Sequence, residues 1–234
     1  MRLLQAIGGA RHGGAEAFFE RFAIALDKVD VEQRVVIRRN EARANYLRQN
    51  GVCTKQLSFG GRLDIITPIY LKRLISEFKP DLVLTWMNRA SCQMPKGDHV
   101  SIGRLGGYYS LKYYKKCDHL IGNTQDIVDY LIDEGWPNDR AHYIPNFVSS
   151  SIQPAVKRSD HMTPIAVPLL LTMGRLHENK GFDVLLKALT HAPRAYLWIA
   201  GAGPEELRLR RQVRALGLKP RVRFLGWRKD IAAL

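Results

Sequence analysis

Short apolar runs of strand length alternate with helical patterns along most of the chain, and glycine turns separate the two in several places. The run 167–173 leads through the turn 174–181 into the helical pattern 182–189, and the run 2–7 leads through glycines into the pattern 17–26. Strands alternating with helices build parallel sheets, whose ligand-binding loops lie at the carboxyl ends of the strands. The pattern therefore predicts an α/β protein with two Rossmann-like parallel-sheet domains.

Two cations flank the glycine turn of the second half, with Arg175 directly after Gly174 and Lys180 just before the predicted helix. The first turn of a helix offers an anion unpaired N–H groups and partial positive charge. An arginine adds a fork that grips two oxygens, and a lysine adds a compact charge. Together these groups suit a diphosphate. The plainer alternative is two solvated loop cations beside an ordinary helix start.

A second glycine turn precedes the first predicted helix, where Gly13 and Gly14 are followed by Glu16. Glycines let the backbone turn sharply and approach a bulky group closely. Such a loop either binds a ligand or only turns the chain, and the residues alone leave both interpretations open. His12, beside the loop, is a lone histidine of the kind that more often lies at a surface than acts in catalysis.

A third glycine turn holds Gly201 and Gly203 and follows the predicted strand 195–200. Pro204 comes next, so the third glycine of a dinucleotide fingerprint is missing. Proline is common at the first position of a helix, and the turn therefore predicts a helix start rather than a dinucleotide site.

The stretches LLTMGRLHENKGFDVLLKAL and YLWIAGAGPEELRLRRQV resemble the donor-binding half of the large group 1 (family 4) retaining glycosyltransferases, which have the GT-B architecture. The resemblance implies that Arg175 and Lys180 hold the diphosphate of a nucleotide sugar and act on the leaving group. It makes Gly174, Gly201 and Gly203 binding positions beside them.

The first half is similar to the same family. Gly13, Gly14 and Glu16 match a G-G-A-E-like loop that faces the cleft between two domains in that family. The segment from CDHLIGNTQDIV to YIPNFV resembles the end of the N-terminal domain and makes Asn146 a binding position, with Phe147 in place of the glycine that many members carry.

The resemblance also implies the division of the chain. Residues 1–150 correspond to an acceptor-side domain, 151–166 to a linker rich in serine and proline, and 167–234 to the start of the nucleotide-sugar domain. In the family that second domain continues through further β/α units with two widely spaced glutamates that contact the donor. We therefore expect an incomplete second domain.

Three other stretches carry weaker signals. In the segment 65–78 the apolar residues fall at helical spacing and predict one packed face opposite a basic face; they are Ile66, Ile69, Tyr70, Leu74 and Phe78. The segment 88–98 is polar and predicts a loop. Tyrosines interleaved with lysines in 110–119 suit either base stacking or a helix whose rings pack inward.

The net charge of +14 requires an anionic partner or an anionic surface. Because the cations are scattered, nucleic acid is an unfavoured partner, and an anionic membrane surface remains a candidate beside a phosphorylated ligand. No apolar run approaches the roughly 20 residues of a spanning helix, and the three cysteines form no C-x-x-C pair. We expect a cytoplasmic protein, peripheral on the inner face of the membrane, without a metal site.

The function implied by the resemblance is transfer of a sugar from a nucleotide-diphosphate sugar to a glycan or lipid-linked acceptor, with retention of configuration. In the family the departing phosphate takes the acceptor proton, and neither a metal nor a cofactor is needed. Two alternatives remain at this point. One is a nucleotide-sugar epimerase on the same scaffold, and the other is a non-catalytic basic module that binds anions or membranes.

Overall fold

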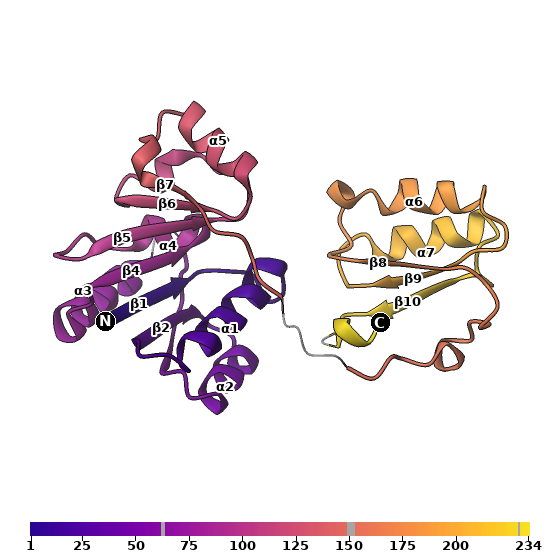
Figure 1. The fold of residues 1–234 in the computed structure, drawn as a ribbon, viewed down its shortest axis with the longest axis horizontal. Coiled ribbons are helices and arrows are strands. Elements are labelled where there is room, and N and C mark those ends of the chain that lie inside the picture. Colours follow the sequence, from indigo (N-terminus) through magenta and orange to yellow (C-terminus); the bar gives the residue numbers. More distant parts are fainter. Residues whose placement is uncertain (62–63, 149–152, 229) are drawn as a thin grey trace. The chain divides into compact units, whose positions relative to one another are not determined.

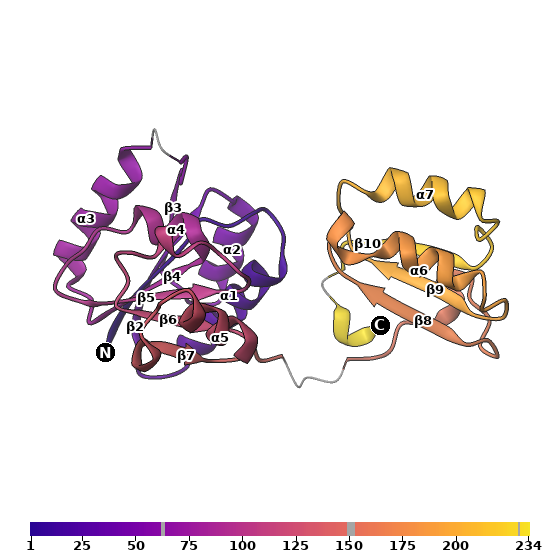
Figure 2. The same ribbon diagram turned by 90° about the horizontal axis from the view of Figure 1, so that it is seen from above.

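The computed structural model describes residues 1–61, 64–148, 153–228 and 230–234. It contains two compact units, Met1–Val148 (unit 1) and Ser149–Leu234 (unit 2). Each unit is built on its own sheet, with seven strands in unit 1 and three in unit 2, and all neighbouring strands are parallel (Figures 1 and 2). The predicted α/β class with two Rossmann-like parallel sheets is confirmed.

The strands of unit 1 lie in the order β3-β2-β1-β4-β5-β6-β7. Their bounds are β1 Arg2–Ile7, β2 Glu32–Arg38, β3 Thr54–Leu57, β4 Leu82–Trp86, β5 Val100–Leu105, β6 His119–Gly122 and β7 Ala141–Tyr143. The helices of this unit are α1 Gly14–Leu26, α2 Glu41–Gln49, α3 Ile66–Phe78, α4 Met87–Gln93 and α5 Gln125–Asp133. The order reverses direction beside β1, which places the loops after β1 and β4 next to each other at the carboxyl edge of the sheet.

Helices cover both faces of this sheet (Figure 1). Alternate residues of β1 serve opposite layers, with Leu3 and Ile7 packing in the cluster under α1 and α2, and Leu4 and Ala6 in the cluster under α3 and α4. Such strands are apolar on both faces because no face meets water. Burying one such side chain contributes about 1.5 to 3 kcal/mol, so the sheet centre is the most stable part of unit 1.

Two helices of unit 1 begin at polar caps that the sequence supplies. The Asn40 side chain accepts a hydrogen bond from the Arg43 N–H at the start of α2. The Thr124 hydroxyl accepts one from the Ile127 N–H at the start of α5. Each cap satisfies a backbone donor that the helix itself leaves unpaired.

Unit 2 has the strand order β10-β9-β8, from β8 Leu169–Met173, β9 Tyr196–Ala200 and β10 Val222–Gly226. Its helices α6 Phe182–Leu189 and α7 Glu206–Ala215 pack in one cluster with the strands (Figure 2). Trp198 of β9 is buried and donates from Nε1 to the Thr163 hydroxyl at 2.9 Å. Residues 153–166, the described part of the predicted linker, thus belong to unit 2 and contact β9 through Thr163.

The strand β8 lies at the edge of this sheet and carries exposed apolar residues. Leu170, Leu171 and Met173 are 42%, 36% and 48% exposed. Parallel sheets are normally covered on both faces, so these exposed apolar residues set β8 apart from the buried strand β9.

The structure overturns two sequence expectations in unit 1. Residues 88–98 were predicted to be a loop, but α4 occupies Met87–Gln93; the helix is short and buries few apolar residues, so no helical period announces it. The tyrosine-rich segment forms only a short 3-10 turn at Leu111–Tyr113. Tyr114 is fully buried and donates its hydroxyl to Asn88 Oδ1 at 2.7 Å, which favours packing over base stacking.

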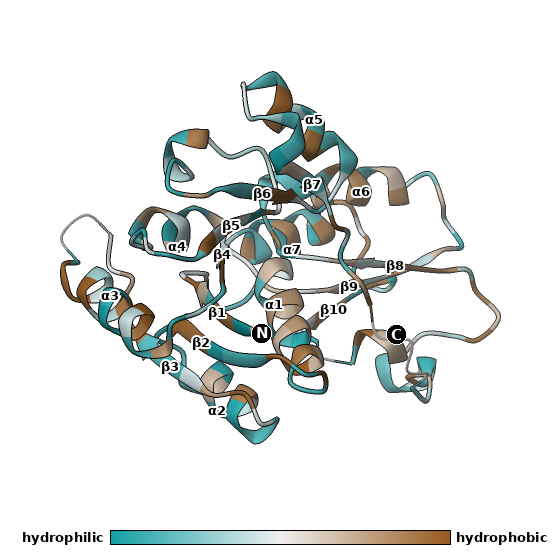
Figure 3. Cartoon of the chain, turned by 60° about the vertical axis from the view of Figure 1, so that its left-hand side comes forward, coloured by the Kyte–Doolittle hydropathy of each residue, from teal (hydrophilic) through white to brown (hydrophobic). Residues whose placement is uncertain are grey.

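The helix α3 was predicted correctly, and its packed face was predicted in part, since Tyr70, Leu74 and Phe78 pack against the core. Ile66 and Ile69 are 69% and 66% exposed, while Thr67 and Leu71 are buried. Figure 3 shows hydrophobic and hydrophilic residues alternating along this helix. Among the described residues, no helix has both the length and the apolar character needed to span a membrane.

Candidate functional site

Two glycine turns of unit 2 lie backbone against backbone at the carboxyl edge of its sheet. Gly174 follows β8 and Gly201 follows β9, and the Gly174 N–H donates to the Ala200 carbonyl at 2.9 Å. A Cβ at Gly201 would overlap the Gly174 carbonyl, and one at Gly203 would overlap the Leu176 backbone. Glycine is therefore required at 201 and 203 by close packing, and the two turns form one rigid platform.

Arg175 and Lys180 are carried by this platform. Leu176 between them is fully buried, and its N–H donates to the Ala202 carbonyl at 3.1 Å. Lys180 ends a 3-10 turn, and Gly181, with φ of 63°, turns the chain into α6. Both cations are exposed, and neither has an ion pair within the part of the chain that the structure describes. The backbone that carries Arg175 and Lys180 is thus held in place, while both side-chain charges are available to a ligand.

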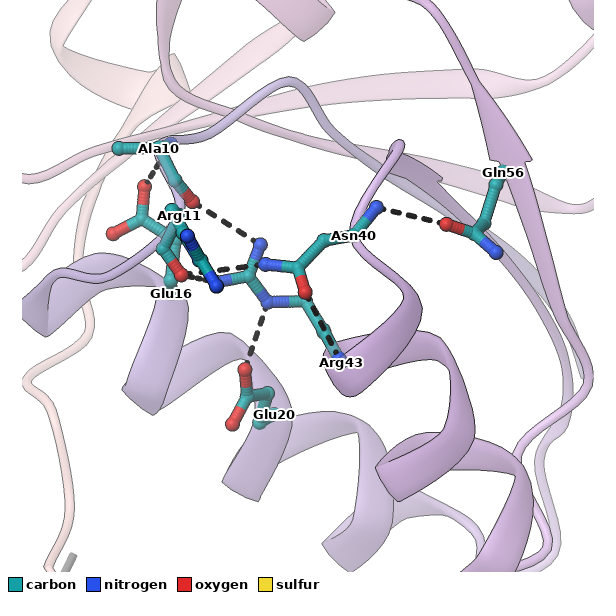
Figure 4. Close-up of polar contacts among 7 residues, drawn as sticks. All are labelled: Ala10, Arg11, Glu16, Glu20, Asn40, Arg43 and Gln56. Atoms are coloured by element: carbon teal, nitrogen blue, oxygen red, sulfur yellow. Dashed lines mark hydrogen bonds and ion pairs between the residues drawn. The ribbon is translucent and has the colours of Figure 1, made fainter.

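The glycine turn of unit 1 is held from inside by Glu16. Its carboxylate is buried, accepts from the Ala10 N–H at 2.6 Å and fills the space beside Gly9 and Gly13, where a Cβ would overlap it (Figure 4). No such crowding surrounds Gly14. The contacts of Glu16 indicate that it shapes the loop, and its carboxylate points to the loop backbone.

Arg43 of α2 clamps the same loop from outside. Its side chain is 4% exposed, pairs with Glu20 at 2.7 Å and donates to the Ala10 and Arg11 carbonyls (Figure 4). Asn40 adds a hydrogen bond from Nδ2 to the Arg11 carbonyl. The loop after β1 is therefore fixed by two helices, which pre-orders its backbone N–H groups.

Asn146 lies in the segment that follows β7, and its side-chain oxygen accepts from Arg104 Nη2 at 2.8 Å. Arg104, near the end of β5, is buried and packs on aromatic rings of unit 1. Phe147, which stands in place of a glycine, contributes one edge-on ring contact with Phe18 at 5.0 Å. The replacement thus has a packing role in this chain.

The sequence analysis did not identify Arg43 and Arg104, because the cations are scattered along the chain and nothing marks these two as buried. A weak signal existed for Arg104, since it follows an apolar strand and precedes a glycine pair at the predicted carboxyl edge of the sheet. For Arg43 nothing in the sequence distinguishes it from Arg48, the exposed arginine of the same helix.

Two further observations concern metal binding and the opposite edge of the unit 1 sheet. Within the described residues, no three histidine, cysteine, aspartate or glutamate side chains lie close enough to hold a metal ion. A hollow of about 500 Å³ in unit 1 is lined by residues such as Arg2 and Glu32, which begin β1 and β2. It therefore lies at the amino end of the sheet, opposite the glycine turn.

Comparison with known proteins agrees with this geometry. Residues 12–151 match the family described as Glycosyltransferase Family 4, and residues 157–234 match Glycosyl transferases group 1. The lipopolysaccharide core biosynthesis glycosyltransferases LpsE and LpsD of Rhizobium meliloti (strain 1021) are 35% and 36% identical over 224 residues. These alignments cover 94% and 93% of this chain and 65% and 64% of the relatives, so the chain spans just under two thirds of their length.

Among solved structures, Anabaena HepE in complex with UDP-glucose superposes with a TM-score of 0.83 at 19% identity. The match covers 100% of this chain and 71% of that structure, which shows that the two share the fold. The family match extends over more than half of the chain and includes the glycine turn of unit 1. The chain belongs to Glycosyltransferase Family 4.

Proposed function

We propose that this protein is a glycosyltransferase that moves a sugar from a nucleotide diphosphate to a glycan acceptor with retention of configuration. The observation that carries the proposal is the pair Arg175 and Lys180, two exposed cations without ion pairs in the described part of the chain, on a rigid glycine platform. Breaking the sugar–phosphate bond leaves negative charge on the diphosphate. Preorganised cations stabilise that charge where it develops.

The roles within the pair follow from their chemistry. Arg175 binds two phosphate oxygens at once, and Lys180 places a single charge on the leaving group. The backbone at Gly174, Gly201 and Gly203 contacts the diphosphate and the sugar, and the close packing of the two turns holds that backbone in place. In unit 1, Gly13 and Gly14 present the loop to the substrate, with Glu16 as the residue that shapes it and Asn146 as a further binding position.

The acceptor that we propose is a core glycan of lipopolysaccharide or a lipid-linked glycan. Support comes from the names of the relatives LpsE and LpsD, both lipopolysaccharide core biosynthesis glycosyltransferases. The net charge of +14 suits an acceptor that carries anionic groups or lies at an anionic surface.

We also infer that unit 1 touches an anionic membrane surface from the cytoplasmic side through α3. Ile65, Ile66 and Ile69 are each at least 66% exposed, and Lys72 and Arg73 continue the same face of the helix. Apolar residues next to cations on one helix face are typical of helices that lie in the membrane interface.

The proposed donor site is tested by titrating the protein with UDP and UDP-sugars in a calorimeter. We expect Arg175→Ala and Lys180→Ala each to weaken binding about 10- to 100-fold, because a charge-assisted hydrogen bond contributes about 1.5 to 3 kcal/mol. Arg194→Ala, which removes another exposed arginine of unit 2, is the matched control. Equal weakening in all three variants, or none in the first two, would refute the diphosphate site.

Product analysis then separates the enzyme classes. The protein is incubated with a nucleotide sugar and candidate acceptors. A transferase forms a new glycosidic bond to the acceptor, whereas an epimerase inverts one stereocentre of the sugar and needs no acceptor. Salt-sensitive binding to DNA or vesicles that Arg175→Ala leaves unchanged, together with no nucleotide binding, would indicate the basic module instead.

A further inference from the structure

Arg104 is a buried cation without an acidic partner in the described residues. Arg104 is 6% exposed, and it forms no ion pair within the described ranges of the chain. Burial lowers the pKa of the Arg104 guanidinium to about 10, and no carboxylate contributes to that shift. An isolated buried charge is expensive, so natural proteins rarely keep one without a purpose.

The contacts of Arg104 satisfy only part of its hydrogen-bonding capacity. Nη2 donates to the Ile144 carbonyl at 2.9 Å and to Asn146 Oδ1 at 2.8 Å. The guanidinium carbon lies 4.9 Å from the Phe18 ring centre and 5.4 Å from that of Trp86. A guanidinium has five N–H donors. The three on Nε and Nη1 have no protein acceptor among the described residues.

Neutral partners do not balance the charge. Two amide oxygens accept hydrogen bonds, and two aromatic faces attract the cation weakly, by about 0.5 to 2 kcal/mol each. The donors left over on Nε and Nη1 lie on opposite edges of the guanidinium, and each can donate a charged hydrogen bond to an anionic oxygen. The missing partner therefore has the chemistry of an oxyanion.

A second arginine without an ion pair in the described residues follows the neighbouring strand β4. Arg89, after the neighbouring strand β4, donates to the Gly8 carbonyl at 3.2 Å and has no ion pair within the described ranges. Burial, and then the nearby Arg38, lowers the pKa of Arg89. Met87, between that strand and Arg89, has φ of 63°, a strained backbone for a residue with a side chain. Such strain persists where the surrounding structure demands it, often at binding sites.

We propose that Arg104 binds a carboxylate or phosphate carried by the sugar part of a substrate, at the carboxyl edge of the unit 1 sheet. The inference rests on the proposed function, because a sugar substrate supplies the anion. Two sources share this chemistry. One is a carboxylate on the transferred sugar of the donor, and the other is a phosphate or carboxylate on the acceptor glycan.

The test uses the full chain labelled with ¹⁵N. The reporters are the Arg104 Nε–H signal, assigned by its loss in Arg104→Gln, and the Trp86 indole signal, assigned with Trp86→Phe. The probes are D-glucuronate and D-glucose 6-phosphate, with D-glucose as the neutral control. We expect saturable shifts with at least one anion below about 50 mM, where millimolar affinity would be visible, and none with glucose.

Variants assign the response to this guanidinium. Arg104→Gln abolishes it, and Arg104→Lys, which keeps the charge but has one nitrogen in place of three, weakens it about tenfold or more. Arg140→Gln removes an exposed arginine of the same unit and leaves it unchanged. The inference is overturned if neither anion saturates, if glucose acts equally, or if Arg104→Lys binds as tightly as the native protein. If Arg104 serves only to hold residues 144–146 in place, neither anion will give a saturable shift.

Calorimetry with nucleotide sugars identifies the source of the anion. A donor source predicts tighter binding of UDP-glucuronate than UDP-glucose, with the difference lost in Arg104→Gln. An acceptor source predicts equal binding of the two donors and an independent shift with the free anions. UDP binding by Arg175→Ala tests the proposed diphosphate site of unit 2, and the anion shifts test Arg104 of unit 1. Either proposal can therefore be refuted while the other stands.

Discussion

The Cα of Gly201 rests directly on the carbonyl group of Gly174, so closely that a Cβ at 201 would overlap that oxygen. Gly201 also has φ of 147°, a conformation that disfavours residues with side chains. Its N–H donates to the Gly226 carbonyl at 2.7 Å, which links the turns after all three strands of unit 2. The platform under Arg175 and Lys180 therefore depends on this one position.

Gly201→Ala is expected to destabilise unit 2 by more than about 2 kcal/mol, because overlap with backbone adds to the strain of the dihedral angle. Gly217→Ala is the control, since its φ is 66° but the space around it is open, and strain alone costs about 1 to 2 kcal/mol. Urea unfolding followed by the indole signal of Trp198 in β9 measures both. Equal losses in the two variants would contradict the packing argument.

Much of the architecture follows from local pattern. Apart from β3 and β7, the strands contain apolar runs of the sequence, and the polar caps Asn40 and Thr124 mark helix starts. The glycine turns were predicted because they follow such runs. In these elements local preference and tertiary packing agree, which is why the sequence suffices.

The features that the sequence did not reveal depend on tertiary contacts. Ile66 and Ile69 were wrongly assigned to the packed face of α3 because the helix has more apolar residues than one face buries, and hydrogen bonds of Thr67 to Asp64 help to select the buried side. Arg43 and Arg104 are buried by neighbours distant in sequence, and no local pattern tells a buried arginine from a solvated one.

Arg43→Met is expected to destabilise unit 1 by about 2 to 4 kcal/mol, since it leaves Glu20 and two loop carbonyls without their donor. Arg48→Met, on the same helix, removes an exposed arginine and should cost less than about 1 kcal/mol. Chemical unfolding of both variants checks the difference. If Arg48→Met lowers the free energy of unfolding as much as Arg43→Met, the contacts of Arg43 with the glycine loop contribute no additional stability.

The carboxylate of Asp64 makes stability depend on acidity. Hydrogen bonds from Ser58 and Thr67, and from backbone N–H groups, hold the pKa of Asp64 well below its ordinary value. A depressed pKa stabilises the fold above the unfolded-state pKa, and that stabilisation is lost as pH falls through the folded-state value. The free energy of unfolding of the native protein minus that of Asp64→Asn should therefore be constant above about pH 5 and shrink below about pH 4.

Unfolding curves of both proteins between pH 2 and pH 7, on the order of one curve per pH unit, give this difference. Asp133→Asn serves as the control, because Asp133 is exposed and makes no side-chain hydrogen bond within the described ranges. A difference for Asp64→Asn that stays flat into acid, or one that Asp133→Asn reproduces, would show that the hydrogen bonds do not control this titration.

The exposed face of α3 makes the membrane proposal measurable. Removing two isoleucines in Ile66→Ser/Ile69→Ser should reduce binding to vesicles rich in phosphatidylglycerol more than tenfold, since each buried isoleucine contributes about 1.5 to 3 kcal/mol. The matched control is Val184→Ser/Leu207→Ser, which removes two apolar residues of unit 2 that are 63% and 74% exposed. Co-sedimentation at low and high salt separates the apolar from the electrostatic part, because each cation near the surface contributes about 1 kcal/mol at low salt. If the native protein stays in the supernatant at low salt, or if both pairs of substitutions act alike, α3 is not the contact, and its isoleucines need a different partner.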